Sequence, residues 1–221
     1  MLTTGEVTEL QVTRLSASQG GAATPQSIEN ALLEETHNPD KNTGAGLLFT
    51  MAHWLTHNGF LIYGGFVRDY VLRAVWHEGM DLDVLLPTGQ SAVRAKLRII
   101  DMLEGAEGLR YIGEGKSSKR VMELLFYHEE VRCEEPFRIQ LVDSILRQKD
   151  SRTDFVANAA QLRNGKVEFM RGSCGEENIT LSDVRADIRN MRMVAVKRIE
   201  GDKYMADRKE KFEKRGWKVI S

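Results

Sequence analysis

Apolar residues recur along the chain at two spacings, every third or fourth position and every second position. The first spacing predicts helices over residues 45–57 and 92–105, and Asn58-Gly59 is typical of a helix end. Short apolar runs predict strands, and these runs cover residues 61–63, 81–86, 109–112, 120–127, 137–143, 155–162 and 167–169. Strands that alternate with helices, with a hairpin at Asn164-Gly165, favour an α/β (α+β) class in which helices flank a mixed sheet.

The two ends of the chain differ in pattern from its middle. Residues 1–23 are rich in Thr, Ser, Gly and Gln and show little periodicity, so we expect a flexible tail there. Thr24-Pro25 is typical of a helix start, and a new helical pattern begins at Leu181-Ser182. We therefore expect a main domain over residues 24–172 and a basic helical extension over residues 173–221.

Composition excludes several classes of protein. The chain has 221 residues, 42% of them hydrophobic and 29% charged, and a net charge of −1, which is ordinary for a soluble globular domain. No apolar run approaches the roughly 20 residues of a membrane helix, and the first residues lack the pattern of a secretory signal. Only Cys133 and Cys174 are present, far apart, which favours a reducing compartment. We expect a cytoplasmic protein without a membrane contact.

The C-terminal part carries a local surplus of positive charge. Residues 192–218 hold ten Lys or Arg against five Asp or Glu. Such a surplus can follow a phosphate backbone, so we expect an RNA partner. The alternative is an ordinary solvated helix face.

Residues 61–86 combine glycines and carboxylates at spacings that suit phosphate chemistry. Gly64-Gly65 follows an apolar run, and backbone N–H groups at glycines can approach phosphates at a helix start. Asp81 and Asp83 lie two residues apart on a predicted strand, so they project to the same side and repel unless a cation lies between them. Mg²⁺ with a nucleoside triphosphate satisfies that arrangement. Asp143, at the end of another predicted strand, is a candidate third carboxylate for a two-metal site.

Two other motifs have simpler interpretations. Gly115-Lys116-Ser117 looks like the end of a P-loop, but Arg110 stands where that motif requires glycine, so we expect a hairpin tip. His53 and His57 are four residues apart on a predicted helix, which suits a metal pair. Because no third ligand is near in the sequence, we interpret them as ordinary surface or core-edge histidines.

Two motifs in this order resemble a known family. GGFVRD at residues 64–69, followed by DLD at 81–83, and RTDFVANA at 152–159 closely resemble the signatures of polymerase-β-like nucleotidyltransferases. The similarity is to class II tRNA CCA-adding enzymes and bacterial poly(A) polymerases, and it covers residues 45–172. It implies the following roles: Asp81 and Asp83 ligate Mg²⁺, Gly64, Gly65 and Arg68 hold the triphosphate, Asp69 orients Arg68, and Arg152 and Asp154 lie near the sugar. Asn158 either pins the strand or has a functional role.

The resemblance implies transfer of a nucleoside monophosphate from an NTP, ATP or CTP, to a hydroxyl such as an RNA 3′ end. Thr153 departs from the family's second motif, and the family's base-reading EDxxR has only one counterpart near the C-terminus, Asp207. The alternatives are a transferase that modifies a protein or small molecule, and an inactive nucleotide-binding or assembly subunit. A homo- or hetero-oligomer fits either possibility.

Overall fold

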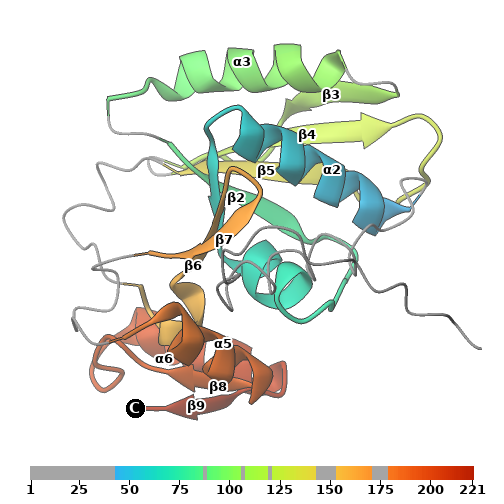
Figure 1. Cartoon of the computed structure of the whole chain (residues 1–221). Helices are drawn as coiled ribbons and strands as arrows, with labels where there is room; N and C mark the ends of the chain where they lie inside the picture. Colours follow the sequence, from blue (N-terminus) through green and yellow to red (C-terminus); the bar gives the residue numbers. More distant parts are fainter. Residues whose placement is uncertain (1–42, 87–88, 106–107, 119–120, 143–152, 171–178) are drawn as a thin grey trace, which may run out of the picture.

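The computed structural model describes residues 43–86, 89–105, 108–118, 121–142, 153–170 and 179–221 (Figure 1). The predicted tail and the helix expected from Thr24-Pro25 lie outside the described residues, and so do Asp143 and Arg152. No helix within the described ranges is long and apolar enough to cross a membrane.

A seven-stranded sheet forms the centre of the protein. Its strand order is β3-β4-β5-β2-β1-β6-β7. The strands are β1 (Leu61–Tyr63), β2 (Asp81–Leu85), β3 (Leu109–Glu114), β4 (Val121–His128), β5 (Phe137–Val142), β6 (Ala160–Arg163) and β7 (Lys166–Phe169). Strands β2 and β5 run parallel, and the other neighbours are antiparallel. The expected mixed sheet flanked by helices is therefore confirmed.

Alternation along the central strands separates a core face from an open face. Leu82 and Val84 of β2 are fully buried and belong to one hydrophobic core with the apolar sides of α2 (Gly44–His57) and α3 (Ala92–Glu104). Asp81 and Asp83 point to the other side of the strand. The helices thus leave the carboxylates on the face where the pocket described below lies.

The segment between β1 and β2 contains one short helix. The helix expected at Phe66 is a six-residue π-helix, η1 (Phe66–Val71), and all six of its residues are buried. Its start is fixed by Gly64, whose φ of +79° lies in the region that side chains disfavour. The tight turn lets a buried helix follow β1 directly.

One predicted strand is wrong in its first half. Residues 155–162 were expected to be extended, but Val156–Asn158 form a single 3-10 turn and β6 begins only at Ala160. Phe155 instead pairs with Ala195 of the C-terminal segment. A contact distant in sequence therefore ends the local strand pattern.

The C-terminal segment contains two helices, as its pattern predicts, and also a small sheet. Its elements are α5 (Leu181–Arg189), β8 (Arg192–Val194), α6 (Lys203–Lys214) and β9 (Lys218–Ile220), and β8 and β9 run parallel. It lies beside the main sheet at the bottom of Figure 1. The backbone N–H of Val196 donates to the carbonyl of Asp154 at 2.9 Å, which ties this segment to the second motif.

Candidate active site

Asp81 and Asp83 stand together on β2 against the glycine turn. Tyr63 of β1 pairs with Asp83, so the chain turns at Gly64 directly beside that carboxylate. A Cβ atom added at Gly64 would lie 2.2 Å from Oδ2 of Asp83, closer than atoms can approach. The carboxylate therefore occupies space that only glycine leaves open.

The negative charges of the two carboxylates repel each other. Burial and the nearby charge of Asp81 raise the pKa of Asp83 to about 7, although Arg208, Arg68 and Lys211 act in the opposite direction. Within the described part of the chain neither carboxylate makes an ion pair within 4.0 Å. The pair has the electrostatics of an incomplete cation site.

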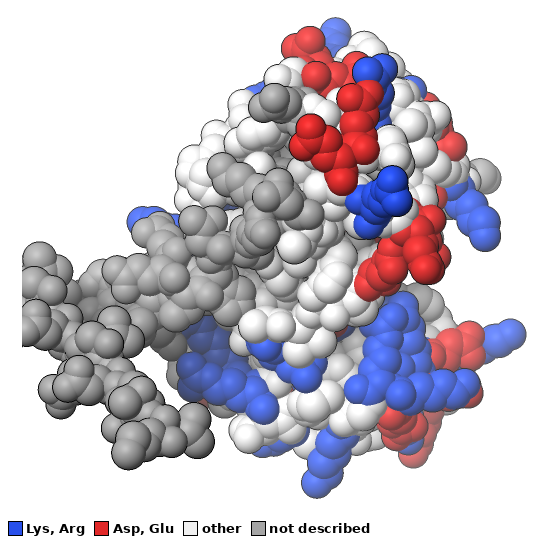
Figure 2. Space-filling view, turned by 90° about the vertical axis from the view of Figure 1, so that its right-hand side faces the viewer, with Lys and Arg blue, Asp and Glu red and all other residues white. Residues whose placement is uncertain are grey.

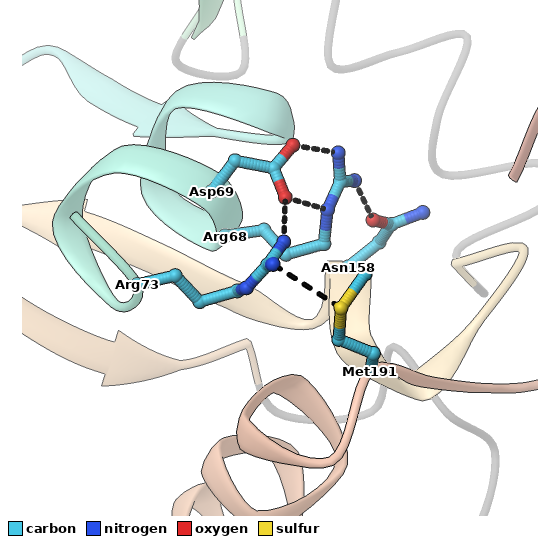
Figure 3. A network of polar contacts seen from close by, with 5 residues as sticks. All are labelled: Arg68, Asp69, Arg73, Asn158 and Met191. Atoms are coloured by element: carbon cyan, nitrogen blue, oxygen red, sulfur yellow. Dashed lines mark hydrogen bonds and ion pairs between the residues drawn. The ribbon is translucent and has the colours of Figure 1, made fainter. Parts of the chain in front are cut away.

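Arg68 and Asp69 form a buried network with Arg73 and Asn158 (Figure 3). Nε of Arg68 donates to Oδ1 of Asp69 at 3.0 Å, and Nη2 pairs with the other carboxylate oxygen. Nη1 of Arg68 donates at 2.6 Å to Oδ1 of Asn158, a residue 90 positions away, and Arg73 reaches Asp69 at 3.3 Å. Asp69 thus contacts Arg68 through both carboxylate oxygens, and Asn158 contacts the guanidinium from the 3-10 turn rather than from a strand.

Aromatic rings of the C-terminal segment cover the same network. The guanidinium carbon of Arg68 lies 5.0 Å from the ring centre of Phe212 and 5.4 Å from that of Trp217. Arg73 lies 4.9 Å from the Trp217 ring. These cation–π contacts bind the first motif to the end of the chain.

Asp154 of the second motif is enclosed by residues of the C-terminal segment. The hydroxyl of Tyr204 donates to its Oδ2 at 3.1 Å, and Nε of Arg208 lies 3.1 Å from the same oxygen. Lys197 adds a third contact, 3.9 Å from the other oxygen. The charge of Asp154 is therefore compensated by the chain itself.

A pocket of about 920 Å³ joins these groups. It is lined by Gly64, Gly65, Arg68, Asp69, Asp81, Asp83, Asp154 and Asn158, so every described residue of the predicted site contributes to it. Its volume suits a nucleotide-sized ligand. The structure brings two motifs that are about 70 residues apart in the sequence into one cavity.

Helix α6 also lines the pocket. Tyr204, Arg208, Lys211 and Arg215 recur at intervals of four, three and four residues, so they share one helix face, and all four line the pocket. Partial desolvation, together with Arg215 and Arg208, lowers the pKa of Lys211. These residues were not predicted to line a site, although their helical spacing in the sequence indicates one shared face. Asp207, the one counterpart of the family's base-reading motif, is exposed and is not among the pocket residues.

The outer face of α6 carries cations that are already neutralised. Lys209 pairs with Glu213 at 3.9 Å, and Lys214 pairs with Glu210 at 2.6 Å. Lys and Arg gather in the lower half of Figure 2, at the height of the C-terminal segment, with Asp and Glu beside them. The basic surplus of residues 192–218 is therefore largely a property of the pocket wall.

The described residues offer a small set of metal ligands. They include no cluster of three or more His, Cys, Asp or Glu side chains that could hold an ion. The residue of β5 in register with Asp83 is Gln140, which also lines the pocket. Asp81 and Asp83 fit a single hard cation completed by phosphate and water oxygens.

The two motifs with simpler interpretations have ordinary surroundings. A strand, β4, follows the Gly115-Lys116-Ser117 loop, so the helix that a P-loop requires does not follow it. The His53 and His57 rings stack with centres 4.0 Å apart, and Nδ1 of His57 lies 2.9 Å from the carbonyl oxygen of His53. Neither motif contributes to the pocket.

Comparisons with known proteins leave the family of the chain open. No family model and no curated protein matches it. Among solved structures, it is similar to a CCA-adding enzyme in complex with ATP, at 16% identity and a TM-score of 0.49, over 86% of this chain and 41% of that protein. The chain thus spans less than half of that protein's length. At this identity and TM-score the likeness assigns neither an activity nor a substrate.

Proposed function

We propose that the protein is an Mg²⁺-dependent nucleotidyltransferase. The observation that carries the proposal is the pair Asp81 and Asp83, which makes no ion pair among the described residues and shares one pocket with cationic side chains of α6. A triphosphate needs positive charge from the protein, and a divalent cation needs carboxylates. One pocket supplies both.

Asp81 and Asp83 would hold the metal ion. Burial and the neighbouring charge of Asp81 raise the pKa of Asp83, as expected for a carboxylate pair without a cation between its members, so the residues fit the group. Mg²⁺ would supply charge neutralisation at the phosphate oxygens. A second ion would need a further ligand, for which Asp143 remains the sequence-based candidate.

The remaining pocket residues bind and orient the nucleotide. Arg68, held rigid by Asp69 and Asn158, and Lys211 of α6 offer N–H donors to the phosphates. Asp154, which also lines the pocket, would contact the sugar, as the resemblance of the second motif implies. In the reaction the acceptor oxygen forms a bond to the α-phosphorus and the bond to the β-phosphate's bridging oxygen breaks. Pyrophosphate leaves with that electron pair, and the acceptor proton passes to water.

An RNA 3′ end is the favoured acceptor, supported by the resemblance of the two motifs and by the basic C-terminal segment. The ion pairs Lys209–Glu213 and Lys214–Glu210 favour a second candidate, because they reduce the charge available to a long phosphate backbone. That candidate is a hydroxyl on a protein or a small molecule.

Incorporation of labelled ATP or CTP into RNA in the presence of Mg²⁺ tests the proposal. We expect Asp81→Asn and Asp83→Asn to lose at least about a hundred- to thousand-fold in rate, the scale of removing one charge-stabilising group from an active site. Asp101→Asn, at an exposed carboxylate of α3 outside the pocket, is the matched control and should retain the wild-type rate.

Label in protein or small-molecule fractions of a lysate, and not in RNA, would assign the second acceptor class. If wild-type protein transfers no nucleotide to any of these acceptors, or if both pocket variants match wild type, the proposed reaction is wrong.

A further inference from the structure

The exposed aromatic ring of Tyr204 lies at one end of the pocket wall. Its side chain belongs to the pocket lining, yet the residue is 57% exposed. Its hydroxyl donates a hydrogen bond to Asp154, and this bond fixes the position of the ring. Large exposed aromatic groups inside a pocket are typical ligand contacts.

The order of residues along α6 separates this ring from Lys211 by a defined distance. The charge of Lys211 acts on both Asp81 and Asp83, so that turn of the helix faces the metal and phosphate end. Tyr204 lies seven residues earlier, which is about 10 Å along a helix at about 1.5 Å per residue. Arg208 lies between these two residues on the helix, and it contacts the same oxygen of Asp154 as the Tyr204 hydroxyl does. This spacing matches the length of a nucleotide, with its triphosphate near Lys211, its sugar near Arg208 and its base near Tyr204.

Polar groups near Tyr204 are already engaged with the protein. Asp154 contacts Tyr204, Arg208 and Lys197, and Asp202 caps α6 by accepting from the backbone N–H of Met205 at 3.2 Å. A base that enters this end therefore meets the open ring more readily than an unused donor or acceptor. Stacking on an aromatic ring accepts every base, because each base has a π face.

The geometry points to Tyr204 as a platform on which the base of the bound nucleoside triphosphate stacks. This inference rests on the proposed function and adds how the base is held, by its face rather than by its hydrogen-bonding edge. It follows that ATP and GTP bind with similar affinity, and that both bind more tightly than CTP and UTP because a purine covers more of the ring.

Titration calorimetry with Mg²⁺ separates the base from the phosphates. The ligands are α,β-methylene ATP, whose α–β linkage cannot be cleaved by the proposed reaction, and inorganic tripolyphosphate, which has no base. We expect Tyr204→Ala to weaken binding of the ATP analogue about 5- to 150-fold, which corresponds to about 1–3 kcal/mol of base stacking. Binding of tripolyphosphate should not change.

Two further variants make the test specific. Tyr204→Phe keeps the ring and loses the bond to Asp154, so we expect it to bind the analogue within about threefold of wild type. Tyr127→Ala removes an exposed tyrosine of β4 outside the pocket, 43% exposed, and should match wild type.

Three results would overturn the inference alone: unchanged binding of the analogue by Tyr204→Ala, equal loss of the analogue and tripolyphosphate, or a loss in Tyr204→Phe as large as in Tyr204→Ala. A wild-type protein that binds neither ligand would instead overturn the proposed function, and this inference with it.

Discussion

Two kinds of carboxylate meet in one pocket, and their surroundings differ. Asp69 and Asp154 each contact at least two cationic side chains of the same chain, Arg68 and Arg73 in one case and Arg208 and Lys197 in the other. Asp81 and Asp83 face each other, and among the described residues neither has an ion-pair partner. All four belong to motifs identified in the sequence. Of the four, Asp81 and Asp83 are the two that need a bound cation to neutralise their charge.

The difference distinguishes carboxylates that stabilise the fold from carboxylates that would bind a ligand. A compensated carboxylate lowers the energy of the fold by holding an arginine in a fixed orientation. An uncompensated pair raises that energy, and a protein retains such a pair where a ligand offsets the cost. Loss of a compensated pair should therefore lower the stability of the fold, whereas loss of an uncompensated carboxylate should weaken ligand binding.

The largest expected effect on stability is at the compensated network. Arg68→Met leaves Asp69 buried with Arg73 as its remaining cationic partner among the described residues, so we expect the free energy of unfolding to fall by about 3–5 kcal/mol. Urea unfolding followed by circular dichroism measures this fall. The matched control is Arg110→Met, which removes an exposed pair with Glu129 and should cost less than about 1 kcal/mol. Equal losses in both variants would show that the network does not stabilise the fold.

The raised pKa of Asp83 predicts that the free energy of unfolding depends on pH in the opposite direction from that of an aspartate with a lowered pKa. Because the pKa of Asp83 is raised to about 7, the folded protein binds more protons than the unfolded chain between about pH 4 and pH 7. Without Mg²⁺, the free energy of unfolding should therefore fall as the pH rises through this window, by roughly 2–4 kcal/mol from this group. Asp83→Asn should remove that fall, and Mg²⁺ at neutral pH should offset it. A variant with the wild-type pH profile would contradict the assignment.

The glycine turn gives a smaller and more local effect. Gly64→Ala places a Cβ against Asp83 in addition to the strain of a positive φ, whereas Gly59→Ala has a φ of +83° and nothing within 4 Å. We expect Gly64→Ala to cost about 1–3 kcal/mol more than Gly59→Ala and to weaken Mg²⁺-dependent nucleotide binding. Thermal unfolding and calorimetry on both variants measure the difference. Equal costs would mean that the carboxylate moves aside freely.

The smallest expected effect compares the two faces of α6. Lys211→Met removes a cation from the pocket wall, and we expect about tenfold weaker binding of tripolyphosphate, equivalent to about 1.4 kcal/mol. Lys214→Met removes a cation that already pairs with Glu210 on the outer face, and it should bind as wild type does. If the two variants bind alike, the separation of the faces has no role in binding.

Much of the fold and half of the pocket were predictable from local pattern. The helices over residues 45–57 and 92–105 and the hairpin at Asn164-Gly165 appear where periodicity and turn residues place them. The glycines and carboxylates of residues 64–83 stand on one wall of the pocket, as their spacing indicates. Local patterns are reliable there because one short segment contains the whole strand, turn and strand.

The other half of the pocket depends on contacts that are distant in sequence. Asn158 was expected on a strand, but the pairing of Phe155 with Ala195 turns the chain and brings its amide to Arg68. The cations of α6 were interpreted as an RNA-binding surface or a solvated face. Only the docking of that helix shows which of them face the pocket.

The sequence by itself determined which groups are available: two carboxylates on one strand face and a pair of glycines at a predicted helix start. These follow from spacing along a single strand or turn. The tertiary structure decided which charges remain uncompensated, because compensation depends on distances between segments that periodicity does not encode. It left Asp81 and Asp83 without an ion-pair partner among the described residues, enclosed Asp154, and placed Tyr204 against Asp154 in the pocket that the carboxylates also line.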